Sequence, residues 1–483
     1  MGTYRILSID GGGIRGVVAA KLLQQIEEEY LQGSSLHDSF DMFVGTSTGA
    51  VIAAAIANNQ SIDKIIDLYK DRNPELFAGA YYRLLRHLDV AINLRIDRFK
   101  DWLCHELKPI AEILRYEFSA IQSLLLLLSA WRPKYDARNR ALKRVMQQEL
   151  GPCQPTFEEI RETKGKHLVI TSYDTVAREK FIFDSEQAEF DDIPVSTAVF
   201  CSSSAPTFFP AKQFATKQER CLIDGGLVAN NPVTIAIAHA LAAGRKAEQA
   251  GDKGILPTSI DEIQILSIGT GDPTRSISFS QAKGWGLLQW ASRLPDIFFD
   301  GASETNHLIA QSLLGSKDYM RLQFELNANN FNGKIDFLND DMDDTRPKNI
   351  ENLLEASRQY FEKFKANFFT ATIQRYEVER QGQGIYDEPP NAFAAEVTAV
   401  QADFFERLKK ETKDRNGLAN GVVNPEPTER PFVFAGVGYP LNLQTEKTTS
   451  LKRQFIARVT KLRHLPSNVF IVFVAVMLLM GPS

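Results

Sequence analysis

The first 49 residues constrain the fold of this 483-residue chain more than any other part of it. A short apolar run leads into Gly11-Gly12-Gly13, and a second apolar run ends at Gly45-Thr46-Ser47-Thr48-Gly49. Between them, the residues from Val17 to Tyr30 repeat an apolar side chain about every four positions, as one face of a helix requires. Strand, glycine turn, helix and strand in this order indicate a parallel sheet with crossover helices. Such sheets place their ligand sites beyond the carboxyl ends of the strands.

The first glycine turn is compatible with two interpretations. Gly11-x-Gly13-x-x-Gly16 after a strand matches the fingerprint of dinucleotide-binding proteins. That interpretation requires an acidic residue about 20 positions further on, at the end of the second strand, to bind a ribose. The second apolar run ends instead in Gly45-x-Ser47-x-Gly49. Dinucleotide binding is therefore the less favoured alternative.

The second glycine turn has the G-x-S-x-G spacing of a nucleophile elbow. A serine on a sharp strand-to-helix turn needs neighbours without side chains two positions before and after it, because backbone and substrate crowd there. The residues that follow, 48–58, are mostly Ala, Val and Ile, which indicates a buried helix. Its amino end would favour negative charge that develops at Ser47. We therefore predict serine hydrolase chemistry.

A serine hydroxyl is a weak nucleophile and needs a base within hydrogen-bond reach. None of the seven histidines lies in a glycine-rich loop at the end of a predicted strand, and His239, on a predicted helix, is the best of them. Asp224 does end an apolar strand, directly before Gly225-Gly226. Asp224 as the sole base predicts a Ser–Asp dyad in which burial raises the proton affinity of the carboxylate. The backbone N–H groups of Gly11-Gly12-Gly13 would bind the oxyanion of the tetrahedral intermediate.

Three segments occur in a characteristic order, Asp10-Gly-Gly-Gly-Ile-Arg-Gly16, Gly45-Thr-Ser-Thr-Gly49 and Asp224-Gly-Gly-Leu-Val-Ala-Asn-Asn-Pro232. Together they resemble the three signatures of the patatin-like phospholipases. Two further segments, Ser202-Ser-Ser-Ala-Pro-Thr-Phe-Phe-Pro210 and Ser267-Ile-Gly-Thr-Gly271, are also similar to segments of that family. The resemblance extends from about residue 3 to about residue 370.

The resemblance implies a three-layer α/β/α fold with a central, mostly parallel sheet, and lipid acyl hydrolysis without a metal or other cofactor. It makes Ser47 the nucleophile and Asp224 the general base. We expect cleavage of fatty-acyl esters of phospholipids or other acyl lipids through an acyl-enzyme on Ser47. A catalytically silent module that binds lipid or is recruited to a membrane is the alternative from another class. The resemblance places four residues in the oxyanion-hole loop: Gly11, Gly12, Gly13 and Arg15.

The predicted organisation is a patatin-like domain over residues 1–375, which contains a helical insertion or cap at 79–150 that is unusually rich in aliphatic residues. A C-terminal extension of unknown role follows at 376–465, and an apolar tail follows at 466–483. The apolar run in this tail, 469–480, is shorter than the roughly 20 residues that span a bilayer. Basic residues before it can attract anionic lipid. We expect peripheral membrane contact, with a packed or disordered end of the chain as the alternative.

Composition restricts the partners and the compartment. A net charge of −5 gives no reason to expect nucleic-acid binding. The four cysteines have no paired metal-binding spacing, and they are too few for a disulfide framework in so long a chain. The first residues contain no basic and apolar leader. We therefore expect a cytoplasmic protein that acts on membrane lipids.

Residues 284–300 are rich in large apolar side chains, with two tryptophans and two phenylalanines among them. A cluster of this density is more often part of a core than exposed. We therefore expect it to pack inside the protein, and the alternative is a membrane-facing lip.

Overall fold

The computed structural model describes much of the chain up to residue 413, all within one compact unit, Met1–Val422. The predicted insertion at 79–150 and the predicted apolar tail at 466–483 lie outside the described residues, as does most of the predicted extension. The described residues are 3–31, 33–71, 155–206, 209, 211–215, 218–251, 254–274, 276–285, 287–333, 335–381 and 403–413.

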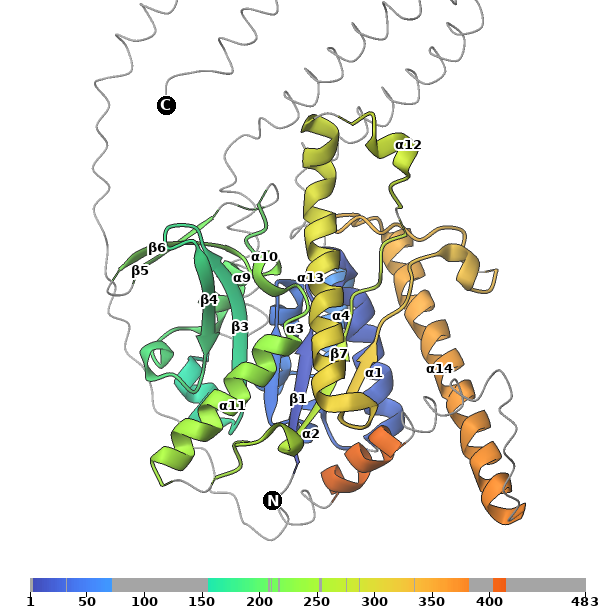
Figure 1. Cartoon of the computed structure of the whole chain (residues 1–483), viewed down its shortest axis with the longest axis horizontal. Helices are drawn as coiled ribbons and strands as arrows, with labels where there is room; N and C mark the ends of the chain where they lie inside the picture. The colour runs from blue at the N-terminus through green and yellow to red at the C-terminus, as the bar shows by residue number, and fades with distance from the viewer. Residues whose placement is uncertain are drawn as a thin grey trace, which may run out of the picture. The chain divides into compact units, whose positions relative to one another are not determined.

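Within the described residues, eight strands form one central sheet in the order β5-β6-β3-β2-β1-β7-β8, with β4 also paired to β3 (Figure 1). Four neighbouring pairs, from β3 through β2, β1 and β7 to β8, are parallel. β4 and β6 run antiparallel to β3, and β5 runs antiparallel to β6. The strands are β1 (Tyr4–Ile9), β2 (Met42–Gly45), β3 (His167–Asp174), β4 (Glu179–Asp184), β5 (Lys212–Ala215), β6 (Glu219–Asp224), β7 (Ile263–Ile268) and β8 (Tyr319–Leu322).

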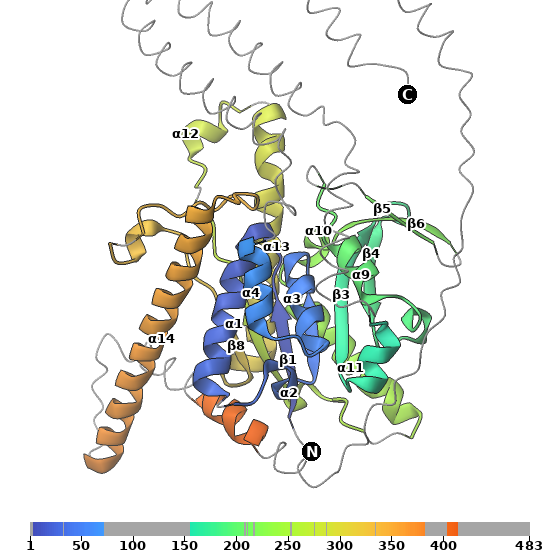
Figure 2. The same cartoon turned by 180° about the vertical axis from the view of Figure 1, so that it is seen from behind.

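Helices cover both faces of the sheet. One face carries α11 (Val233–Gln249) and α13 (Leu287–Asp318), which is interrupted at Gly315 (Figure 1). The other face carries α1 (Gly16–Tyr30), α3 (Thr48–Ala57) and α4 (Ile62–Asp71), as Figure 2 shows. The predicted three-layer α/β/α fold with a mostly parallel sheet is confirmed. The remaining helices are η1 (Gly13–Arg15), α2 (Leu36–Ser39), η2 (Glu159–Thr163), η3 (Ala188–Phe190), α9 (Val195–Ser202), α10 (Gly226–Ala229), η4 (Ile260–Glu262), α12 (Phe279–Ala282), η5 (Ala328–Asn330) and α14 (Pro347–Gln381).

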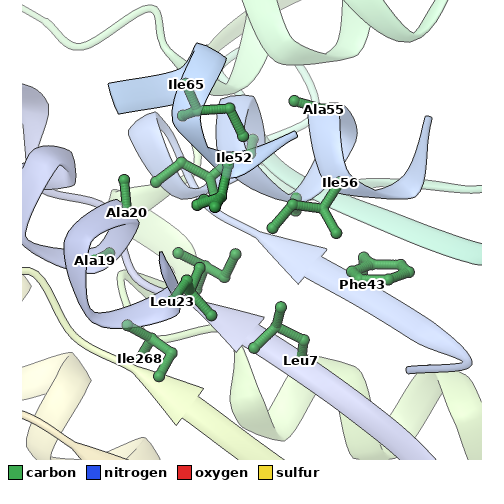
Figure 3. Close-up of a cluster of buried hydrophobic side chains, with 14 of the residues drawn as sticks. Leu7, Ala19, Ala20, Leu23, Phe43, Ile52, Ala55, Ile56, Ile65 and Ile268 are labelled. Carbon is green, nitrogen blue, oxygen red and sulfur yellow. The ribbon is translucent and has the colours of Figure 1, made fainter. Parts of the chain in front are cut away.

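The two helical layers bury alternate residues of the same strands, because successive side chains of a strand point to opposite faces. In β1, Leu7 and Ile9 join the cluster under α1, α3 and α4, whereas Tyr4 and Ile6 join the cluster under α11. Figure 3 shows Leu7 on the sheet side of the first cluster, with side chains of α1 and α3 around it. β1 is therefore buried on both faces, as is usual for a central parallel strand.

The helical segment 403–413 packs on this core. Phe404, Phe405 and Leu408 are buried in the cluster that contains α1. Phe405 stacks on Tyr30 of α1, with ring centroids 4.4 Å apart. The buried Arg5 of β1 donates a hydrogen bond of 3.0 Å to the hydroxyl of Thr412 and forms an ion pair with Glu411 of the same segment. Part of the predicted extension thus contributes to the core of the α/β unit.

Candidate active site

Ser47 lies in the sharp turn between β2 and α3. Its backbone has φ 54° and ψ −118°, a conformation that side-chain-bearing residues rarely adopt. A Cβ on Gly45 would lie 2.3 Å from the carbonyl oxygen of Gly49, and a Cβ on Gly49 would lie 2.2 Å from the carbonyl oxygen of Ile9. Both glycines are therefore required by close backbone packing. The side chain of Ser47 is partly exposed in an otherwise buried turn.

Asp224 ends β6 and meets Ser47 across β3. The Ser47 Oγ donates a hydrogen bond of 2.7 Å to Asp224 Oδ2, and the backbone N–H of Gly226 donates one of 2.7 Å to Asp224 Oδ1. The carboxyl group is buried, and this burial raises its pKa to about 6. The two hydrogen bonds to the carboxylate oppose the shift, because they favour the charged form.

The sheet register explains why the two side chains meet. Gly45 of β2 pairs with Ile170 of β3, whereas Asp224 of β6 pairs with Ser172, two residues further along β3. Ser47 follows Gly45 by two residues and therefore lies at the level of Asp224. The sequence pattern suggested that these strands end at one edge of the sheet. β6 is antiparallel to β3, so its end reaches this level from the opposite direction.

His239 does not approach Ser47. Its Nδ1 lies 2.6 Å from Asp184 Oδ2, and the other carboxylate oxygen of Asp184 lies 2.7 Å from Nε2 of the buried His167. His167 begins β3, so this pair of histidines lies at the amino end of that strand. His239, the best base candidate among the histidines in the sequence, therefore has Asp184 as its partner.

The glycine loop after β1 borders the same site. The N–H of Gly11 donates a hydrogen bond of 3.0 Å to the carbonyl oxygen of Asn230. One of the three N–H groups expected to bind the oxyanion is therefore already used. The N–H groups of Gly12 and Gly13 donate no hydrogen bond to the described part of the chain. Gly13 has φ 60°, a left-handed conformation that glycine adopts without strain. Within the described residues, these two backbone donors have no partner.

Residues 7–237 match the family model described as patatin-like phospholipase. This span contains β1 with its glycine loop, Ser47 and Asp224. Over these residues the chain is similar to the patatin-like phospholipase family.

Individual relatives agree with this family. The chain is 26% identical over 396 residues to Patatin-like protein 2 of Oryza sativa subsp. indica, an alignment that covers 74% of this chain and 84% of that protein. It is 25% identical over 346 residues to a protein of Solanum tuberosum named "Probable inactive patatin-3-Kuras 1", covering 66% of this chain and 78% of that one. Among solved structures, VipD from Legionella pneumophila matches with a TM-score of 0.33 and 13% identity, covering 87% of each chain.

The loop after β7 forms hydrogen bonds with the glycine loop and with Arg15. The hydroxyl of Thr270 donates a hydrogen bond of 2.8 Å to the carbonyl oxygen of Gly11. The buried guanidinium of Arg15 donates to the carbonyl oxygens of Gly271, at 3.3 Å, and Gly12, at 3.5 Å. Arg15 thus ties the glycine loop to its neighbour through carbonyl groups. These hydrogen bonds are compatible with the position of Arg15 in the oxyanion-hole loop that the resemblance implies.

Three consecutive serines at the end of α9, Ser202, Ser203 and Ser204, contact the candidate site, and no role was predicted for them from the sequence. The N–H of Ser47 donates a hydrogen bond of 2.8 Å to Oγ of Ser202, and the hydroxyl of Ser203 donates one of 3.3 Å to the carbonyl oxygen of Ser47. The N–H of Asp224 donates to the carbonyl oxygen of Ser204 at 3.1 Å. The only signal in the sequence was the likeness of Ser202-Ser203-Ser204-Ala205-Pro206 to a family segment.

The start of α13 exposes apolar side chains near the patatin-like site. Phe298 is 61% exposed, and Leu294 and Ile297 are also exposed. The neighbouring Phe299 reaches Gly226, where an added Cβ would lie 3.0 Å from its ring. α13 starts beyond the sheet and passes α10 (Figure 1). The expectation that residues 284–300 pack in the core is therefore wrong for Phe298 and its exposed neighbours.

A metal or dinucleotide cofactor would need a characteristic set of side chains. The described residues contain no group of three or more His, Cys, Asp or Glu side chains arranged to hold a metal ion. At the end of β2, where a dinucleotide-binding protein would need a carboxylate, Thr46 and Ser47 follow Gly45. None of the helices in the described ranges is both long and apolar enough to cross a bilayer.

Proposed function

We propose that this protein is a lipid acyl hydrolase in which Ser47 and Asp224 form a catalytic dyad. The Ser47 Oγ attacks the carbonyl carbon of a fatty-acyl ester while Asp224 accepts its proton. The tetrahedral intermediate then expels the alcohol, which takes the proton from Asp224, and an acyl-enzyme remains. Water activated by the same carboxylate releases the fatty acid. The observation that carries the proposal is the 2.7 Å hydrogen bond from Ser47 Oγ to Asp224 Oδ2.

The environment of Asp224 supports its role as the base. A carboxylate with an ordinary pKa is too weak a base to remove a proton from a serine hydroxyl efficiently. Burial raises the pKa of Asp224 to about 6. The carboxylate is then largely charged at neutral pH but has a higher proton affinity than an exposed aspartate.

The glycine loop supports the stabilisation of the oxyanion. We assign the N–H groups of Gly12 and Gly13 as the donors, because the N–H of Gly11 is already bonded to Asn230. A single donor of this kind lowers the transition-state free energy by about 3 kcal/mol. Arg15 would act by holding the loop through Gly12 and Gly271.

The surface near the site supports a lipid substrate. We define the apolar patch as Leu227, Leu294, Ile297 and Phe298, all of which are exposed. Leu227 lies in α10, directly after Asp224-Gly225-Gly226, and the other three lie on α13. Acyl chains bury apolar surface favourably against such side chains. We propose peripheral contact with membrane phospholipids or other acyl lipids here. Contact through the C-terminal tail stays a prediction.

The test is fatty-acid release from mixed phospholipid vesicles by the full-length protein and by Ser47→Ala and Asp224→Asn. We expect each variant to lose on the order of 10³-fold in rate while its circular dichroism spectrum is unchanged. A fluorophosphonate probe should label Ser47 in the wild type and not in Ser47→Ala. Full activity of Asp224→Asn would exclude Asp224 as the base. Labelling of Ser47 without fatty-acid release would exclude phospholipids as substrate.

A catalytically silent lipid-binding module is the second candidate, since one relative carries the word inactive in its name. That candidate predicts vesicle binding with neither fatty-acid release nor labelling of Ser47. The intact hydrogen bond between Ser47 and Asp224 favours the hydrolase, because a silent module has no need to keep both side chains in contact.

A further inference from the structure

We propose that Ser202 is a positioning residue that holds the backbone of Ser47 in the conformation that directs Oγ to Asp224. This inference rests on the proposed function and adds a residue to it. Ser202 is the last residue of α9 and is completely buried. Its Oγ accepts the hydrogen bond from the backbone N–H of Ser47 at 2.8 Å.

The backbone of Ser47 needs such a partner because it is strained. A residue other than glycine at φ 54° and ψ −118° persists only where its surroundings hold it. The preceding N–H, that of Thr46, still bonds to the carbonyl oxygen of Ile9 in β1. At Ser47 the chain turns out of the sheet, and the N–H pairs with a side-chain hydroxyl instead of a backbone carbonyl. Without Ser202 this N–H would lose its partner, and the turn could relax.

The same segment also holds the other half of the dyad. The N–H of Asp224 donates to the carbonyl oxygen of Ser204 at 3.1 Å, and the N–H of Gly225 donates to that of Ser202 at 3.2 Å. Ser47 follows β2 and Asp224 ends β6, and β3 lies between these two strands in the sheet. The serines at the end of α9 therefore connect two loops that no direct strand pairing connects, and Ser202 contacts both.

Removing the Ser202 hydroxyl should impair the chemical step rather than substrate binding. In Ser202→Ala we expect kcat to fall by about 10- to 100-fold, because a small misplacement of a reacting group has effects of this size. We expect KM to change less than about twofold. Ser202→Thr should restore most of kcat, because threonine keeps a hydroxyl oxygen on Cβ.

The pH profile provides a readout that a merely structural role would not change. The hydrogen bond from Ser47 lowers the pKa of Asp224, against the larger effect of burial. A displaced Ser47 weakens that bond and raises the pKa of Asp224. The acid limb of kcat/KM should therefore move to higher pH in Ser202→Ala and return in Ser202→Thr.

Ser185→Ala is the matched control. Ser185 is also completely buried, and its Oγ accepts a hydrogen bond of 2.9 Å from a backbone N–H, that of Leu168 near the amino end of β3. Like Ser202→Ala, this variant removes a serine hydroxyl that accepts a hydrogen bond from a backbone N–H. The lost bond lies near the amino end of β3, away from Ser47. We expect Ser185→Ala to reduce thermal stability as much as Ser202→Ala does, with kcat unchanged.

The experiment measures kcat, KM and the pH profile with a soluble short-chain ester, together with the melting temperature and hydrogen exchange of the peptide that contains Ser47. Faster exchange of this peptide in Ser202→Ala alone, with the loss of kcat, supports the inference. Equal kcat in Ser202→Ala and wild type, equal losses in both alanine variants, or no recovery in Ser202→Thr would overturn it. A wild type that neither hydrolyses ester nor reacts with a fluorophosphonate contradicts the proposed function itself and removes the positioning role with it.

Discussion

At the scale of single residues, the site depends on a carboxyl group whose charge state is set by burial. Asp224 lies in the interior, and no charged side chain of the described residues contributes to its pKa shift. Two hydrogen bonds within the described part of the chain, from Ser47 and from the N–H of Gly226, offset the loss of hydration. The same burial that strengthens the base therefore opposes its ionisation.

This arrangement predicts the pH dependence of the reaction. Only the deprotonated form of Asp224 accepts a proton, so kcat/KM should rise about tenfold per pH unit at low pH and level off above a midpoint near 6. The measurement is the pH profile of a soluble ester under conditions that keep the fold intact.

Asp300 provides the control for this profile, because partial desolvation also raises its pKa to about 6 although the residue is exposed. The variant Asp300→Asn removes this second titration and should keep the midpoint near 6. A midpoint near 4 in the wild type, or its loss in Asp300→Asn, would contradict the assignment to Asp224.

At the scale of elements, α13 connects the buried dyad with the protein surface. Phe299 packs toward Gly226 beside Asp224, whereas the adjacent Phe298 is exposed in the apolar patch. Further along the helix, Leu308 is equally exposed, at 63%. Ten residues of helix separate the two side chains by about 15 Å along the axis. One helix therefore offers an exposed apolar residue near the site and another far from it.

Substituting these two residues tests the patch. We expect Phe298→Ser to lower vesicle binding and fatty-acid release from vesicles by about 5- to 10-fold, because burial of a large apolar side chain in lipid contributes more than 1 kcal/mol. Its activity on a soluble short-chain ester should be unchanged. Leu308→Ser should behave as wild type in both assays, and sedimentation with vesicles measures the binding. Equal effects of the two substitutions would exclude the patch as the lipid-binding surface.

At the scale of the whole molecule, the chain beyond α14 takes part in the α/β core. α14 continues to Gln381, through the boundary predicted at residue 375, and the segment 403–413 then returns to α1 and β1. We propose that this segment belongs to the folding unit of the patatin-like domain. The predicted boundary between the rest of the extension and the apolar tail, at residue 466, stays a prediction.

The energetic weight of the segment 403–413 can be measured. Phe405 is completely buried and stacks on Tyr30, so Phe405→Ala should lower the free energy of unfolding by about 3–5 kcal/mol. The adjacent Glu406 is exposed, and Glu406→Ala should change it by less than about 0.5 kcal/mol. Denaturant unfolding measures both values. Similar small effects of the two variants would show that the segment is not part of the cooperative core.

The sequence alone determined the local features of the site and the class of fold. Gly45 and Ser47 identify a strand-to-helix turn because a Cβ on Gly45 would clash with Gly49, only four residues further on. The need for glycine at position 49 depends instead on the carbonyl oxygen of Ile9 in the neighbouring strand β1. Periodic apolar residues identified the helices and strands for the same reason. Family resemblance also singled out Asp224 before any geometry was known.

Tertiary structure decided the features that join distant segments. The antiparallel direction of β6, the bond from Gly11 to Asn230 and the hydroxyl of Ser202 on the Ser47 backbone all depend on residues far apart in sequence. The exposure of Phe298 likewise depends on where α13 extends beyond the sheet (Figure 1). Backbone sterics and periodicity are properties of a continuous segment, whereas hydrogen-bond partners and burial are set by the packing of the whole chain.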